Sequence, residues 1–160
     1  MFFGSSKPVI GRASLIINLA RDQVFDFVGH SFFVNYTKWS PEVQKLQLMQ
    51  GETIAVGTLM RQVRVDHGHK SESTFKVSEF DPPRKICFDG VSNAYRCIYE
   101  FEEDGAQPET TKLTFTFEFP ELELMLRPFE KLVRVAVQDG ANRTARNLKG
   151  LIESQSGHRK

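Results

Sequence analysis

Apolar positions in the last third of the chain repeat with a helical period. Between Glu121 and Ile152, apolar or small residues recur every three or four positions, which is typical of one face of a long helix. They are Leu122, Leu126, Phe129, Val133, Val137, Gly140, Thr144, Leu148 and Leu151 or Ile152. Pro128 interrupts this pattern, because proline cannot donate a hydrogen bond inside a helix. We therefore expect a kink, or a short helix before Pro128 and the main helix after it.

The preceding part of the chain alternates between apolar and polar residues, as half-buried strands do. The clearest strand is Thr111–Phe119, in which every second residue is leucine or phenylalanine. Six further strands are predicted, at Arg12–Leu19, Val43–Gln50, Thr58–Asp66, Ser71–Phe80, Lys85–Asp89 and Tyr95–Glu102. Short turns such as His67-Gly68-His69 join consecutive strands, so the sheet should be antiparallel.

Two short helices are predicted between the first two strands. The first contains Asp22 in its opening turn and ends at Gly29, and the second runs from His30 to Ser40, where Pro41 stops it. The fold class is therefore α+β, a seven-stranded curved antiparallel sheet wrapped around a long C-terminal helix. In that helix, we expect Gly140 to allow close packing of helix on sheet, and the alternative is that it leaves room for a ligand.

The length of 160 residues fits one domain. We expect this domain to span 11–153, between a flexible leader at 1–10 and a polar tail at 154–160. The composition includes 14 phenylalanines but only one tryptophan and three tyrosines. Phenylalanine adds apolar area without a polar atom to satisfy, so these residues indicate a large core, a cavity lined by rings, or both.

The charge and the apolar runs exclude several classes of partner. A net charge of +1 gives no field that would attract nucleic acid. The apolar runs are too short to cross a membrane. The N-terminus lacks a secretory signal, so we expect a cytoplasmic protein in which Cys87 and Cys97 are reduced and buried. If the two cysteines lie on adjacent strands, they could cross-link under oxidation.

The candidate chemistry is sparse. Asp66, His67 and His69 surround a turn glycine, and two histidines in a hairpin turn do not converge on one ion, so we expect no metal site. No nucleophile elbow, paired-cysteine motif or phosphate-binding glycine loop is present, and no cofactor is expected. Gln62 and Arg64 share one strand face, and the pattern does not fix which face looks inward. Surface charge is the favoured interpretation of Arg64, and a contact with a polar head group is the alternative.

Several short segments resemble motifs of one superfamily, in the order in which that superfamily has them. They are Leu15-Ile16-Ile17-Asn18-Leu19 with Val24-Phe25-Asp26-Phe27-Val28, Trp39-Ser40-Pro41-Glu42-Val43, Val56-Gly57-Thr58, the segment from Val77 to Ile86 (VSEFDPPRKI), and the segment from Asn147 to Glu153 (NLKGLIE). Together they resemble the START-like or polyketide cyclase (SRPBCC) superfamily, which has the helix-grip fold. The resemblance covers 11–153.

This resemblance implies a deep apolar cavity between the sheet and the last helix, and it does not specify a function. Our first hypothesis is a module that binds a small hydrophobic molecule, such as a lipid, a quinone or a polyketide-like ring. The predicted ligand-binding residues are Trp39, Phe75, Val77, Phe88, Tyr95, Cys97, Tyr99, Phe115, Phe117, Phe129, Val133 and Val137. One alternative is a cyclase, aromatase or dehydratase that uses polar groups in the same cavity. The other is an accessory protein that fills its own cavity with side chains and binds a protein partner.

Overall fold

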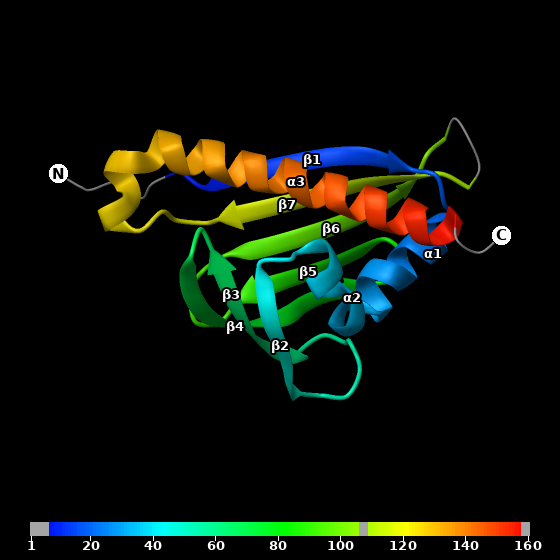
Figure 1. The fold of residues 1–160 in the computed structure, drawn as a ribbon, viewed down its shortest axis with the longest axis horizontal. Coiled ribbons are helices and arrows are strands. Elements are labelled where there is room, and N and C mark those ends of the chain that lie inside the picture. Colours follow the sequence, from blue (N-terminus) through cyan, green and yellow to red (C-terminus); the bar gives the residue numbers. More distant parts are fainter. Residues whose placement is uncertain (1–6, 106–108, 158–160) are drawn as a thin grey trace.

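The computed structural model describes residues 7–105 and 109–157 and contains one sheet, two short helices and one long helix (Figure 1). The strands are β1 (Val9–Ile17), β2 (Val43–Gln50), β3 (Leu59–Asp66), β4 (His69–Asp81), β5 (Lys85–Gly90), β6 (Arg96–Glu103) and β7 (Thr111–Phe119). The helical segments are α1 (Arg21–Phe25), a π-helical turn η1 (Asp26–His30), α2 (Phe32–Trp39), a 3₁₀ segment η2 (Leu124–Phe129) and α3 (Glu130–Gly157).

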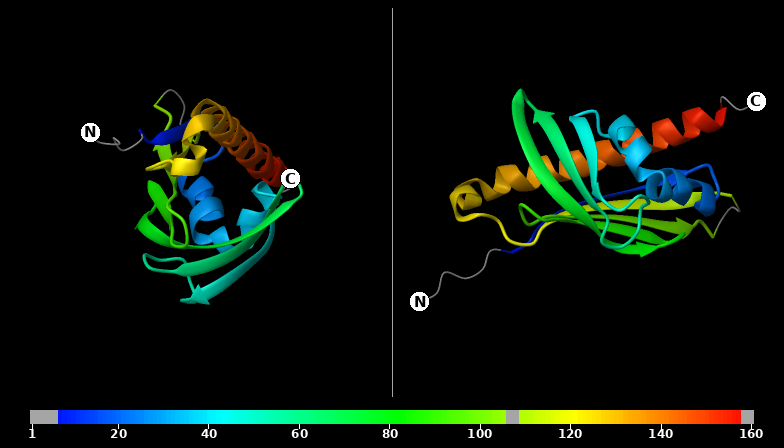
Figure 2. Two further views of the ribbon diagram at one scale, coloured as in Figure 1. Left: turned by 90° about the vertical axis from the view of Figure 1, so that its left-hand side faces the viewer. Right: turned by 90° about the horizontal axis from the view of Figure 1, so that it is seen from below.

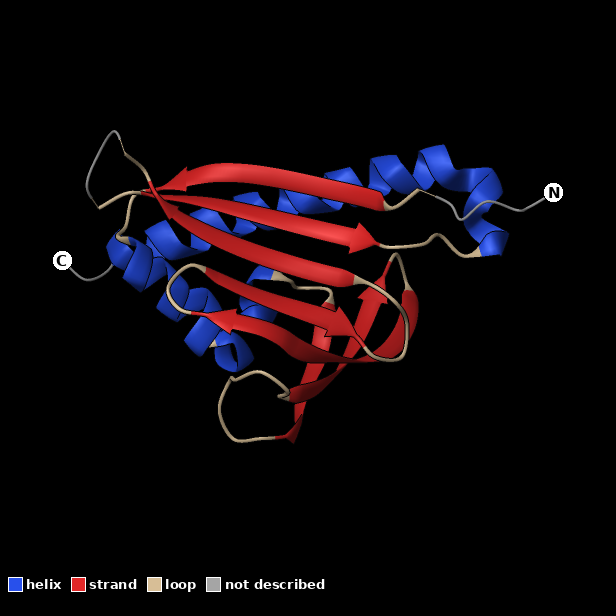
Figure 3. Cartoon of the chain, turned by 180° about the vertical axis from the view of Figure 1, so that it is seen from behind, coloured by secondary structure: helices blue, strands red, loops and turns tan. Residues whose placement is uncertain are grey.

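The seven strands form one antiparallel sheet in the order β1-β7-β6-β5-β4-β3-β2. Neighbouring strands follow one another along the chain except at β1, which pairs with β7 from Val9 opposite Phe119 to Ile17 opposite Thr111. Figure 2 shows the sheet curving around α3, and Figure 3 shows the strands in front of the helix when the molecule is seen from behind. The fold class predicted from the sequence is confirmed.

The bounds of several elements differ from the sequence prediction. β1 begins at Val9, inside the expected leader, and α3 continues to Gly157, inside the expected tail. The remaining parts of the leader and the tail, 1–6 and 158–160, lie outside the described residues. Pro128 lies in the 3₁₀ segment and α3 begins after it, so the predicted break is confirmed.

The first short helix does not end at Gly29, as the sequence had suggested. Its backbone continues through a π-helical turn to His30. Gly29 is buried there, and a Cβ at this position would lie only 2.8 Å from the ring of Phe25. Glycine is therefore needed for close packing against an aromatic ring, not to terminate the helix.

The long helix approaches the sheet most closely at β1. A Cβ on Gly11 would lie 2.5 Å from the backbone oxygen of Val137, so only glycine fits between the strand and the helix. One residue farther along each element, the side-chain amide of Gln138 accepts a hydrogen bond from the backbone nitrogen of Arg12 (3.1 Å) and donates one to its carbonyl oxygen (2.8 Å). These contacts fix α3 along β1.

Side chains fill one end of the space between sheet and helix. This end lies next to α1, α2 and the C-terminal half of α3 (Figure 1). The ring of Phe32 from α2 stacks on Phe88 from β5, with 4.2 Å between centroids. Trp39, Phe101, Leu113, Leu148 and Ile152 are also buried in this core. No helix within the described residues is long and apolar enough to cross a membrane.

Candidate functional site

A cavity of about 550 Å³ lies at the other end of the space between the sheet and the long helix, beside the N-terminal half of α3. This volume lies within the range of ligand-binding pockets, roughly 300–1,000 Å³. Its wall includes aromatic residues of β6 and β7 and several small or aliphatic residues of α3. The α3 residues are Val133, Ala136, Val137, Gly140, Ala141, Arg143 and Thr144. The hypothesis that phenylalanines fill the whole interior is therefore wrong.

Gly140 faces this open space. A Cβ at Gly140 would meet no atom within 4 Å, whereas the close approach of α3 to the sheet occurs at Gly11. The prediction that Gly140 allows close packing of helix on sheet was wrong, and the alternative, room beside the helix, describes its position.

Most of the predicted ligand-binding residues lie on the wall of this cavity. They are Trp39, Tyr95, Cys97, Tyr99, Phe115, Phe117, Val133 and Val137. The alternation along β6 and β7 brings them together, because Cys97 pairs with Phe117 and Tyr99 pairs with Phe115 on the same face of the sheet. The rings of Tyr95 and Phe117 are stacked and nearly parallel, with 5.7 Å between their centroids.

Four of the predicted residues are not brought to the cavity, which corrects the sequence analysis. Phe75, Val77 and Phe88 do lie on the inner face of the sheet, but they are buried in the core, where Phe32 covers the phenylalanines. Phe129 is 55% exposed at the end of η2. A 3₁₀ segment has three residues per turn, so the helical phase of α3 does not extend back to Phe129.

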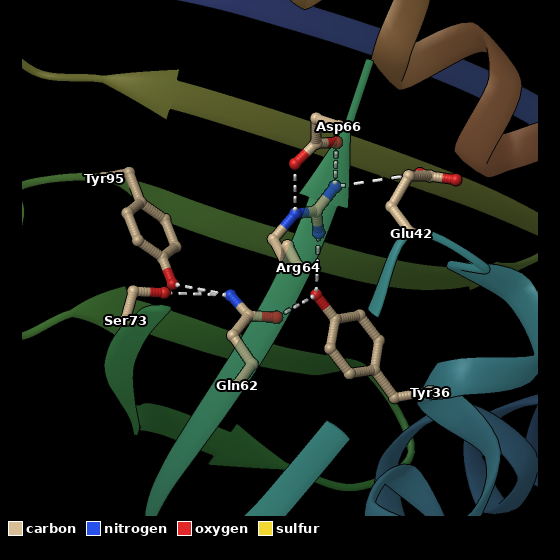
Figure 4. A network of polar contacts seen from close by, with 7 residues as sticks. All are labelled: Tyr36, Glu42, Gln62, Arg64, Asp66, Ser73 and Tyr95. Atoms are coloured by element: carbon tan, nitrogen blue, oxygen red, sulfur yellow. Dashed lines mark hydrogen bonds and ion pairs between the residues drawn. The ribbon is translucent and has the colours of Figure 1, made fainter. Parts of the chain in front are cut away.

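A chain of polar contacts lines the side of the cavity formed by β3, β4 and α2 (Figure 4). The hydroxyl of Tyr36 donates to Oε1 of Gln62 at 3.0 Å. Nε2 of Gln62 donates to the hydroxyl oxygens of Ser73 (3.2 Å) and Tyr95 (3.4 Å). Gln62 is buried, and this network satisfies its amide, as a buried polar group requires. The cavity thus has an apolar wall and a polar wall.

Arg64 extends this network, so the favoured prediction that it is an ordinary surface charge was wrong. Its side chain lines the cavity and is 27% exposed. Nη1 donates to the Tyr36 hydroxyl at 3.4 Å, and Nε and Nη2 donate to the two carboxylate oxygens of Asp66 at 3.2 and 3.1 Å. Nη2 also lies 3.7 Å from a carboxylate oxygen of Glu42. β3 therefore presents Met60, Gln62 and Arg64 to the interior.

Burial raises the pKa of the phenols of this site still further above neutral pH. Desolvation raises the pKa of Tyr36 to about 12, although the nearby Arg64 charge opposes the shift. Desolvation also raises the pKa of Tyr95 and of Tyr99. Burial disfavours the charge of Arg64, but its hydrogen bonds to Asp66 raise the pKa of the guanidinium above its ordinary value. The phenols and the guanidinium of this site are therefore hydrogen-bond donors at neutral pH.

The remaining candidate groups lie elsewhere or are unreactive. None of the histidines that the structure describes lines the cavity. His67 and His69 lie at the hairpin between β3 and β4, and the described residues contain no group of three potential metal ligands. Cys97 faces the cavity, and burial raises the pKa of its thiol to about 12. Cys87 lies opposite Ile98, the residue next to Cys97 on β6. Adjacent residues of a strand point to opposite faces, so the two cysteines lie on opposite faces of the sheet and cannot cross-link.

Part of this site was not evident from the sequence. The sequence pattern places Tyr36 on the apolar side of α2, and it does not connect Glu42, Asp66 or Ser73 with a cavity. The signal that could have revealed the site is the pair Gln62 and Arg64, two positions apart on a strand face that begins with Met60. An apolar strand face that becomes polar toward one end indicates a polar wall.

Comparisons with known proteins agree with this fold. Residues 9–153 match the family model described as polyketide cyclase/dehydrase and lipid transport. No curated protein has a significantly similar sequence.

Solved structures with the same fold come from bacteria and plants. The Zhui aromatase/cyclase from Streptomyces sp. R1128 superposes with a TM-score of 0.75 at 13% identity, over 93% of this chain and 96% of that chain. TTHA0849 from Thermus thermophilus has a TM-score of 0.71 at 19% identity, over 92% and 99%. The major latex-like protein 151 of Panax ginseng has a TM-score of 0.67 at 12% identity, over 91% and 97%. At these identities the likeness shows the fold alone.

Proposed function

Because the chain belongs to the polyketide cyclase/dehydrase and lipid transport family, we propose that it binds a small hydrophobic molecule in the cavity between its sheet and α3. The family match also confirms the resemblance to the START-like superfamily. A lipid, a quinone and a polyketide-like ring are the candidate ligands, and a cytoplasmic location stays a prediction.

The observation that carries this proposal is an unfilled cavity with two unlike walls. Apolar side chains of β6, β7 and α3 form one wall, and the network from Tyr36 to Tyr95 forms the other. Affinity would come from the apolar area removed from water, about 25 cal/mol per Å² before the costs of association. The aromatic side chains of the lining, among them Tyr99, Phe115 and Phe117, favour a ligand that contains a ring system.

Filling part of the cavity from α3 should weaken this binding. Gly140→Leu adds a side chain at a position that lines the cavity and where a Cβ meets nothing within 4 Å, so the new atoms should extend into the ligand's space. We expect the affinity for the neutral fluorescent probe N-phenyl-1-naphthylamine to fall at least about tenfold, a change of about 1.4 kcal/mol. Fluorescence titration of the purified protein measures the loss.

The matched control is Gly150→Leu, the same substitution on the same helix. Gly150 is exposed and does not line the cavity, and its Cβ would also meet nothing within 4 Å. Both variants gain helix propensity, so both should fold, and only Gly140→Leu should lose the probe. Equal probe binding by the two variants would place the probe outside the cavity and contradict the proposal.

The convergence of Tyr36 and Arg64 favours a second candidate function, ring closure of a polyketone bound in the cavity. In an intramolecular aldol addition, an enol carbon of the substrate forms a bond to a ketone carbon. The ketone oxygen takes a proton and becomes a hydroxyl, the enol loses its proton to water, and later loss of that hydroxyl as water completes an aromatic ring. The hydroxyl of Tyr36 could turn its proton from Oε1 of Gln62 to the ketone oxygen and so stabilise the transient negative charge that develops there, beside the Arg64 guanidinium.

Tyr36→Phe separates the two candidate functions. If the protein is a cyclase, this variant should close the ring of a synthetic linear β-polyketone about 10²-fold more slowly. Binding of N-phenyl-1-naphthylamine should stay within about threefold, because the ring of residue 36 remains. Product formation followed by liquid chromatography decides the question, and a wild-type rate equal to the rate without protein would rule out the cyclase.

A further inference from the structure

Negative charges outnumber positive charges beside the polar wall. Arg64 is the cation that contacts this wall, and each of its three guanidinium nitrogens already has a protein partner. Two carboxylates, those of Asp66 and Glu42, lie within 3.1 and 3.7 Å of Nη2. The negative charges beside Arg64 thus outnumber its positive charge.

The other charged residues of the lining do not reverse this balance. Glu72 forms an ion pair with Arg61, which points away from the cavity on β3. Arg143 lines the cavity from α3, but it is exposed, and water screens an exposed charge. A site built for an anion needs uncommitted N–H donors and excess positive charge. The described residues beside Arg64 provide no such excess of positive charge, because two carboxylates face one guanidinium.

Neutral hydrogen-bonding groups dominate the same wall. The hydroxyls of Tyr36, Ser73 and Tyr95 surround the amide of Gln62 (Figure 4). A hydroxyl can both donate and accept, so this wall can match a ketone, a quinone oxygen or a phenol without an unpaired charge.

We propose that the cavity selects ligands whose polar group is uncharged and rejects carboxylates and phosphates, with Glu42 and Asp66 as the residues that determine this selectivity. The proposal rests on the proposed function and narrows it to neutral oxygenated ring compounds. Free fatty acids and phosphate esters would be poor ligands, because an anion beside Arg64 would also face two carboxylates at short range.

Three compounds of similar shape test this selectivity in the wild-type protein. Naphthalene, 2-acetylnaphthalene and 2-naphthoate share one ring system and differ in their polar group. Each competes with N-phenyl-1-naphthylamine at neutral pH, where the naphthoate is ionised. We expect 2-acetylnaphthalene to bind at least about tenfold more tightly than 2-naphthoate, with naphthalene as the reference for the ring alone. Equal or tighter binding of the naphthoate would overturn the selectivity.

Two variants assign the selectivity to the carboxylates. Glu42→Gln and Asp66→Asn should each strengthen the binding of 2-naphthoate at least about threefold while changing that of 2-acetylnaphthalene by less than about twofold. The control is Glu118→Gln on β7, which changes the net charge equally but lies outside the cavity lining. An improvement as large in the control would overturn the role of Glu42 and Asp66. If none of the three compounds displaced the probe, the proposed function would fail, and the selectivity with it.

Discussion

Replacing Trp39 by alanine is expected to lower the free energy of unfolding by about 3–5 kcal/mol, the cost of removing a large buried ring. Trp39 is 1% exposed, and its ring lies 5.7–6.1 Å, centroid to centroid, from Phe32, Tyr36 and Tyr99. Its carbonyl oxygen also accepts a hydrogen bond from Asn147 on α3 at 2.9 Å. The tryptophan therefore joins α2, the sheet and the long helix.

Urea denaturation followed by far-ultraviolet circular dichroism measures this effect. Phe33→Ala is the matched control, because Phe33 is an aromatic residue of the same helix that is 38% exposed. Its cost should be below about 1 kcal/mol. A loss for Trp39→Ala no greater than that of the control would contradict its role in the core. Trp39→Ala is thus a poor test of binding, since it weakens the fold that forms the cavity.

Gly11→Ala should lower the free energy of unfolding by about 1–3 kcal/mol, as overpacking typically does. The added Cβ would lie 2.5 Å from the carbonyl oxygen of Val137 and 2.8 Å from its Cγ1. The nearest obstacle is backbone, which cannot rotate away, so α3 has to shift relative to β1. The hydrogen bonds between Gln138 and the backbone of Arg12 lie next to this contact and should weaken as well.

Thermal melting shows the effect as a lower Tm, by roughly 2–4 °C per kcal/mol for a chain of this size. Gly140→Ala is the control, and its shift in Tm should have the opposite sign. Its Cβ meets nothing within 4 Å, and alanine stabilises a helix interior by up to about 1 kcal/mol relative to glycine. The same chemical change should thus lower Tm at residue 11 and raise it at residue 140. A shift of the same sign in both variants would refute the assignment of the close contact to Gly11.

The sequence predicted the fold well because the fold depends on periodicity. Alternation along Thr111–Phe119 gave the right strand and the right inner face, and Pro128 gave the right break before α3. These features follow from local backbone geometry, which a single segment of sequence records.

The sequence of a strand does not show in the same way whether an inward-facing residue is covered by another element. Phe75, Val77 and Phe88 face inward as expected, but α2 covers them and so places them in the core. Alternation tells which face of the sheet a residue occupies, and only tertiary packing decides whether another element covers it. The position of α2 could not be inferred from the spacing of any one strand.

The polar wall was hard to predict for a related reason. β3 carries Arg61 on one face and Gln62 and Arg64 on the other, so alternation alone does not identify the inner face. Burial of Arg64 depends on partners from distant segments, Glu42 before β2 and Tyr36 in α2. The sequence likewise does not show that the close contact between helix and sheet lies at Gly11, because this contact depends on where α3 crosses β1.

The pairing of β1 with β7 has a consequence for the biosynthesis of the protein. Strands β2 to β7 each pair with the strand before or after them, so these pairs can form as the chain leaves the ribosome. β1 emerges first, but its partner, from Thr111 to Phe119, emerges almost last. At a translation rate of about 5–20 residues per second, the first strand waits on the order of ten seconds with its backbone and its apolar face unpaired. During that interval a nascent chain depends on chaperones, or on the solubility of its own N-terminal segment, to avoid aggregation.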